Sequence, residues 1–173
     1  MTRQIWRTSW LLTLMLFTVA AYCQTPGVTQ PNVVLLTVSG EVATPLKLTA
    51  ADLAKLPHRS LTARTHDGKE ASFAGVELGE VLKLAGVKSG EQLRGKELAL
   101  FLVVEAADQY RAVFALAELD HAFTDRVVLL TDQRDGKPLS EKEGPLRLVA
   151  PDEKREGRWV RQVIALKVQR AAN

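Results

Sequence analysis

The chain contains very little cysteine: one residue, Cys23, among 173. A single cysteine excludes a disulfide framework and a cysteine-rich metal site. Because it lies near the N-terminus, the rest of the chain also lacks a thiol nucleophile. Net charge is small as well, since 23 Lys and Arg against 20 Asp and Glu give a formal +3. This balance provides no general electrostatic drive toward nucleic acid or anionic lipid.

Several catalytic and nucleotide-binding motifs are absent. The sequence has no Gly-x-Ser-x-Gly elbow, no Gly-x-Gly-x-x-Gly loop and no Walker loop. Aromatic residues make up 6% of the chain and form no platform for stacking bases. The three histidines, His58, His66 and His121, lie at neither helical nor hairpin spacing, so we expect no metal site built on them. These absences argue against a nucleophilic hydrolase, a nucleotide-binding protein and an RNA-binding protein.

What is present begins with the pattern of an export signal in residues 1–23. Arg3 and Arg7 give a positive start, residues 10–20 are almost wholly apolar, and small side chains at 19–21 suit a signal peptidase. The apolar stretch is shorter than the roughly 20 residues that span a bilayer, so we expect no stable membrane insertion. The sequence therefore predicts a periplasmic or secreted protein.

Two alternatives to this processing fit the sequence less well. Lipid attachment at Cys23 is disfavoured by the bulky Tyr22 just before it. The two N-terminal arginines are not adjacent, unlike those of the twin-arginine signals that carry folded proteins. We therefore expect cleavage without lipid, after export of an unfolded chain.

Residues 24–32 hold two prolines and one glycine and are expected to form a flexible lead-in. A single domain is expected over residues 33–170. Its hydrophobic patterns predict many short strands separated by a few short helices. The expected strands are 33–38, 46–48, 61–65, 71–73, 98–104, 111–116, 127–130, 147–150 and 164–168. This pattern indicates an α+β fold with a curved mixed sheet or a small barrel.

Local signals place some of these elements more firmly. Thr49 is the expected cap of one helix, with Asp52 three positions later, and a helix at 78–85 ends at Gly86. A third short helix is expected over 117–123. The apolar run 98–104 predicts a strand in the middle of a sheet, with Phe101 buried. The alternating Ile164, Leu166 and Val168 predict one buried face of the last strand.

Three ordered segments resemble the sulfite oxidase-type molybdopterin-binding domain. The first is Phe73-Ala74-Gly75-Val76-Glu77-Leu78, followed by Val81-Leu82 and Ala85-Gly86. The second runs from Val128-Leu129-Leu130 through Asp135-Gly136-Lys137-Pro138-Leu139 to residues 144–151, and the third from Arg158-Trp159-Val160-Arg161 to Val168. The resemblance covers 33–168 and implies that family's fold, with an oxidoreductase activity and a molybdopterin cofactor.

One departure from the family changes this expectation. The family's molybdenum is held by a cysteine thiolate a few residues before the segment that begins at Phe73, whereas residues 65–69 here read Thr-His-Asp-Gly-Lys. Neither His66 nor Asp67 replaces a soft thiolate without changing the electronics of the metal. The chain is also shorter than the family's full enzymes, and its export signal suits an unfolded chain without cofactor. We therefore expect molybdenum catalysis to be lost and no cofactor to be bound.

The candidate binding residues gather in two groups, and two further residues join them through the resemblance. Guanidinium groups pair with phosphate or carboxylate oxygens, and an indole can wall a flat ligand. A basic cluster holds Lys154, Arg155, Arg158, Trp159 and Arg161, and a polar turn holds Asp108, Tyr110 and Arg111. Arg147 lies in a family-like segment, and His66 lies in the stretch where the family has its cysteine. Each group also has a plainer interpretation: a solvated loop with Trp159 on the core, and an ordinary turn.

Three functional hypotheses follow. The first is an exported domain that keeps the family scaffold without molybdenum catalysis and binds an anionic small molecule. The second is an active oxidoreductase that holds its metal through a ligand other than cysteine. The third is a module that binds a periplasmic protein partner and no small molecule.

Overall fold

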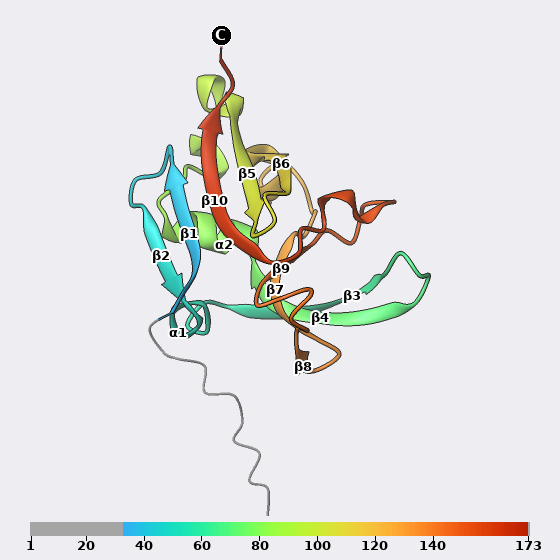
Figure 1. Cartoon of the computed structure of the whole chain (residues 1–173). Helices are drawn as coiled ribbons and strands as arrows, with labels where there is room; N and C mark the ends of the chain where they lie inside the picture. Colours follow the sequence, from blue (N-terminus) through green and yellow to red (C-terminus); the bar gives the residue numbers. More distant parts are fainter. Residues whose placement is uncertain (1–32, 173) are drawn as a thin grey trace, which may run out of the picture.

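Two open β-sheets make up most of the described structure (Figure 1). The computed structural model describes residues 33–172, so the expected export signal and lead-in lie outside the described residues. Each sheet combines strands from distant parts of the chain, and short helices lie between some of the strands. The strands are β1 (Val34–Gly40), β2 (Leu46–Thr49), β3 (His58–Arg64), β4 (Glu70–Glu77), β5 (Leu100–Ala106), β6 (Arg111–Ala115), β7 (Leu129–Arg134), β8 (Lys137–Pro138), β9 (Arg147–Val149) and β10 (Val163–Arg170).

The first sheet has the order β2-β1-β10-β5-β6. β1 and β10 are parallel, whereas the other neighbours are antiparallel, which makes the sheet mixed as the sequence indicated. Helix α1 (Ala50–Leu53) follows β2 and begins with the expected capping box between Thr49 and Asp52. The α+β fold class is confirmed, and residues 33–172 form open sheets and not a small closed barrel.

The second sheet has the order β3-β4-β7-β8, and β9 pairs with β7 on a separate path. β3 and β4 form a long hairpin that extends away from the first sheet (Figure 1) and turns at Asp67 and Gly68, where a turn was expected. At Gly75 the register of β4 on β7 shifts, and an added Cβ would lie 2.2 Å from the Leu130 carbonyl oxygen. Only glycine allows this close approach of the two backbones.

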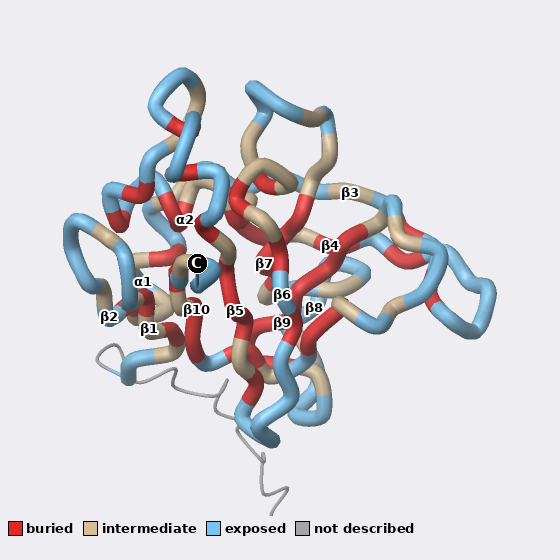
Figure 2. The backbone as a smooth tube through the Cα atoms, turned by 90° about the horizontal axis from the view of Figure 1, so that it is seen from above, coloured by how far each residue is buried: buried red, intermediate tan, exposed pale blue. Residues whose placement is uncertain are grey.

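The hydrophobic core is formed by buried side chains from strands of both sheets. Figure 2 shows buried residues concentrated on β5, β7 and β10. Helix α2 (Leu78–Leu84) adds Leu78, Val81 and Leu82 to this core, and Gly86 just beyond it has a φ of 71°, as the sequence predicted. Within residues 33–172, no helix is long and apolar enough to cross a membrane.

Two predictions about individual side chains are wrong. Phe101 lies on the outer face of β5 and is only partly buried, whereas its neighbour Leu102 is fully buried. Ile164 is 45% exposed because the pairing of β10 with β5 shifts between Val163 and Ala165, which turns Ile164 outward. The alternation seen in the sequence is therefore broken by a bulge.

Some element boundaries also differ from expectation. The strand expected from residue 98 begins at Leu100, because Gly95–Ala99 form a 3-10 helix, η2. The helix expected over 117–123 is a single 3-10 turn, η3 (Leu116–Leu119). The strand expected from residue 127 begins at Leu129. Two further 3-10 turns, η1 (Gly90–Gln92) and η4 (Glu156–Arg158), lie in loops.

Candidate ligand-binding site

A cleft of about 550 Å³ opens where three distant parts of the chain meet. They are the turn between β3 and β4, the turn between β5 and β6, and the segment from η4 to β10. We call it the cleft, and its lining residues are His66, Ala106, Asp108, Tyr110, Lys142, Glu156, Gly157, Trp159, Val160, Arg161 and Gln162. Five of the ten residues proposed from the sequence are among them.

Tyr110 and Asp108 shape one wall of the cleft. The backbone N–H of Tyr110 donates to the Asp108 carboxylate at 2.9 Å, which stabilises the turn between β5 and β6. The Tyr110 hydroxyl donates to the Gly157 carbonyl at 2.5 Å. The turn and η4 are therefore held together across the cleft.

Trp159 forms part of the floor but belongs to the core. It is 4% exposed, and its indole N–H donates to the Ala150 carbonyl at 2.8 Å. Its ring meets Phe73 edge-on, with 5.9 Å between the centroids. A side chain this deeply buried has no free face for stacking a ligand, so the plainer interpretation of Trp159 agrees with its placement.

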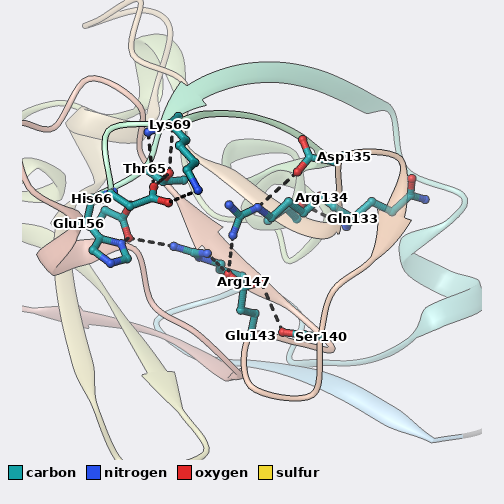
Figure 3. Close-up of polar contacts among 12 residues, drawn as sticks. Thr65, His66, Lys69, Gln133, Arg134, Asp135, Ser140, Glu143, Arg147 and Glu156 are labelled. Carbon is teal, nitrogen blue, oxygen red and sulfur yellow. Dashed lines mark hydrogen bonds and ion pairs between the residues drawn. The ribbon is translucent and has the colours of Figure 1, made fainter.

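Arg147 is the buried charge behind the cleft. It is 2% exposed, and its guanidinium carbon lies 5.6 Å from the Phe73 ring centroid and 5.5 Å from that of Trp159. The guanidinium pairs with Glu143 and, at 3.1 Å, with Glu156 (Figure 3). Burial lowers the pKa of Arg147, and the two carboxylates oppose that shift.

Sequence reasoning missed Glu143, Glu156 and Arg134 as site residues. Arg134 pairs with Glu143 at 3.4 Å and so extends the ion-pair network outward (Figure 3). A signal was available, because Arg147 sits in the apolar run Leu146 to Ala150. A charge in a buried strand needs opposite charges nearby, which points to the flanking acids.

The turn at residues 65–69 is closed by its own hydrogen bonds. The backbone N–H of Thr65 donates to the Lys69 carbonyl and that of Gly68 to the Thr65 carbonyl, both at 2.8 Å. The Thr65 hydroxyl also bonds the Asp67 carboxylate, which lowers the pKa of Asp67. The turn borders a small hollow of about 80 Å³ lined by Thr65, His66, Asp67, Arg134, Glu143, Arg147, Glu156 and Arg161.

Arg161 is an arginine of the cleft that no carboxylate of the described residues neutralises. It lines both the cleft and the small hollow, is exposed, and makes no ion pair with another residue of 33–172. In contrast, Arg158 pairs with Glu118 at 3.1 Å and with Glu153 at 2.5 Å, and stacks on Phe114 at 4.2 Å. It lines neither the cleft nor the small hollow.

The remaining candidates also lie outside these two cavities. Arg111 pairs with Glu105 at 2.8 Å. Lys154 and Arg155 are exposed on the loop before η4. The structure therefore gathers His66, Asp108, Tyr110, Trp159 and Arg161 in the cleft, with Arg147 beside it, and leaves the other four elsewhere.

Residues 22–173 match the family model of the oxidoreductase molybdopterin binding domain. The chain belongs to this family. Among solved structures, the sulfane dehydrogenase SoxCD from Paracoccus pantotrophus is similar, with a TM-score of 0.61 and 24% identity. The match covers 77% of this molybdopterin-binding-family chain but only 37% of the SoxCD chain, and at this identity it shows the fold alone. No curated protein matches the chain.

The family's cofactor has a metal part, and the residues of the 65–69 turn do not fit it. A thiolate is the soft ligand for such a centre, and the turn offers only His66 and the Thr65-bound Asp67. Across residues 33–172, no group of three or more His, Cys, Asp or Glu could hold a metal ion. The anionic part of a ligand is a separate question, because Arg161 stands in the cleft independently of a thiolate.

Proposed function

We propose that this molybdopterin-binding-family domain works without molybdenum catalysis and binds a small anionic molecule in the cleft. The observation that supports the proposal best is Arg161, an exposed guanidinium that pairs with no carboxylate of 33–172 and lines the cleft. A guanidinium presents a fork of donors that matches carboxylate and phosphate oxygens.

The carboxylates that line the cleft are bonded to groups other than Arg161. Glu156 is engaged by Arg147 and by the backbone N–H of His66, and Asp108 accepts the N–H of Tyr110. Lys142 adds a second positive charge to the lining. A volume of about 550 Å³ falls in the range of clefts that hold small organic ligands.

The loss of molybdenum catalysis rests on the donor set of the 65–69 turn. Its oxygen donors are bonded within the turn, and no cysteine occurs beyond residue 23. Protein purified from its native host should carry far less than one molybdenum per chain, measured by elemental mass spectrometry. Near-stoichiometric molybdenum would overturn this part of the proposal and favour a metal held by another ligand.

Export to the periplasm is part of the same proposal and rests on the charge and apolar pattern of residues 1–23. The intact mass of the exported protein should correspond to a chain that begins at Tyr22 or Gln24. An added lipid mass on an N-terminal Cys23 would contradict it.

Anion binding is tested through Trp159, which forms part of the floor of the cleft. With Trp6 and Trp10 replaced by Phe, Trp159 is the one remaining tryptophan. A pterin phosphate should change its fluorescence in a saturable way, and Arg161→Ala should weaken the response at least tenfold.

Arg155→Ala is the matched control, because it removes the same charge from an exposed position on the neighbouring loop. It should leave the titration unchanged. An equal response in wild type and Arg161→Ala would contradict the proposal. No response in any variant would favour a module that binds a protein partner.

A further inference from the structure

The carboxylate of Glu156 is bound in the manner of an anionic ligand. One of its oxygens, Oε1, accepts the backbone N–H of His66 at 2.6 Å. The other, Oε2, lies 3.1 Å from Nη2 of Arg147 and 3.8 Å from Nδ1 of His66. Backbone N–H groups and guanidinium groups are the donors that proteins use to bind oxyanions. We call the backbone N–H of His66 and the guanidinium of Arg147 the Glu156 seat.

The donors of the seat are held in place without help from Glu156. The backbone of His66 belongs to the turn closed by Thr65, Gly68 and Lys69. Arg147 is packed against the rings of Phe73 and Trp159 and is also paired with Glu143. A site whose donors are already oriented binds an incoming anion at a small entropic cost.

The seat also contains a hydrogen-bond donor that has no partner among the described residues. Nε of Arg147 is buried and makes no hydrogen bond among the described residues. The exposed guanidinium of Arg161 lines the same small hollow. A larger oxyanion than the carboxylate would therefore find additional donors nearby.

Glu156 itself is the less constrained partner. It begins η4, a turn of three residues, and is followed by Gly157. Its side chain is 17% exposed, so a change of rotamer would move the carboxylate toward solvent while the donors stay in place. The space that it leaves would join the adjacent small hollow.

We propose that Glu156 is an internal substitute for the ligand, which an external oxyanion displaces from the seat. The inference rests on the proposed function, because the seat adjoins the anion-binding cleft. The shared chemistry of the ligand is a group with two or more acceptor oxygens, a carboxylate, sulfate or phosphate. A tethered competitor acts at an effective concentration on the order of millimolar, so it would weaken binding of free anions and admit only those that also engage Arg161.

Inorganic sulfate is the probe for this test, added to the full chain with chloride at matched ionic strength as the reference. Glu156→Ala should bind sulfate about tenfold or more tightly than wild type by calorimetry. The variant should also be less stable without sulfate, since Arg147 loses a partner, and should regain its melting temperature when sulfate is added. Glu156→Gln keeps most of the side-chain volume and provides a second variant should Ala fold poorly.

Asp152→Ala is the matched control, because it removes one carboxylate from an exposed position of the same loop. It should bind sulfate no better than wild type. Equal sulfate affinity in the Glu156 and Asp152 variants would overturn the inference, while Arg161-dependent binding of pterin phosphate to wild type would still stand. Sulfate binding in Glu156→Ala that survives Arg161→Ala would support the seat and contradict the proposed role of Arg161.

Discussion

The hydroxyl of Tyr110 and the carbonyl oxygen of Gly157 lie 2.5 Å apart, although they are 47 positions apart in the chain. This hydrogen bond joins the turn between β5 and β6 to the segment that leads to Arg161. Both partners are in loops, so the width of the cleft depends on contacts of this kind more than on either sheet.

Tyr110→Phe removes this bond while keeping the ring. Because the contact is at the surface, we expect unfolding to become easier by about 1 kcal/mol or less. Binding of pterin phosphate should weaken several-fold, because the segment that carries Arg161 is no longer hydrogen-bonded to the turn between β5 and β6. Fluorescence titration measures the affinity and urea unfolding the stability. Val113→Ala, a substitution at an exposed position of β6, is the control. An unchanged affinity in Tyr110→Phe would mean that binding does not depend on this hydrogen bond.

Adjacent residues of β5 should respond very differently to truncation. Leu102 is fully buried, so Leu102→Ala should cost about 2–5 kcal/mol of unfolding free energy. Phe101 is only partly buried on the outer face, and Phe101→Ala should cost clearly less despite the larger group removed. Chemical denaturation of both variants checks the order. A reversed order would place the strand one residue out of register.

These two residues illustrate what the sequence could predict about the fold. The apolar run at 98–104 identified a strand, but a run with no alternation cannot say which side chains face inward. In β10 the apolar residues alternate, yet this pattern gave the wrong face for Ile164 because of the bulge near Val163. The bulge depends on pairing with β5, about 60 residues earlier, which a local sequence pattern cannot reveal. By contrast, the capping box at Thr49 and the turn at Asp67 are set by neighbouring residues, and both were predicted.

Gly75→Ala should be poorly tolerated. An added Cβ would lie 2.2 Å from the Leu130 carbonyl oxygen and 2.5 Å from the Thr131 Cα, and both belong to backbone that cannot rotate away. We expect a loss of about 3 kcal/mol or more. Gly157→Ala is the comparison, because its Cβ would meet no atom within 4 Å. Thermal melts of the two variants that differ little would show that β4 and β7 are farther apart than described.

Acid stability should depend on the capping box of α1. The Thr49 hydroxyl, followed by the Thr49 backbone N–H and Lys55, lowers the pKa of Asp52 from 3.8 to about 2. A lowered folded-state pKa gives stability that is present above pH 3.8 and lost as the pH falls toward 2. Thr49→Ala should raise the pKa of Asp52 toward 3.8 and reduce this loss. An NMR titration of Asp52 measures the shift, with Thr62→Ala as the control; an unchanged Asp52 titration in Thr49→Ala would contradict the assignment.

The candidate site was predictable in kind but not in detail. Sequence reasoning identified basic side chains near residue 160, and the structure places Arg161 in the cleft. It could not separate Arg161 from Arg158, because the difference lies in the carboxylates of Glu118 and Glu153 that neutralise Arg158. Residue type is local information, whereas the partners of a charge are set by the fold.

The parallel pairing of β1 with β10 determines when the first sheet can form. The Thr37 hydroxyl donates to the Ile164 carbonyl at 3.3 Å, although the two residues are 127 positions apart. In the sheet, β10 lies between β1 and β5. Of the strands in residues 33–172, the last along the chain is therefore an interior strand. Until it arrives, β1 and β5 each lack a neighbour, and closing such a long loop slows folding. A chain truncated before residue 163 would lose the middle of its sheet, so shortened products should remain open to proteases instead of persisting as partly folded domains.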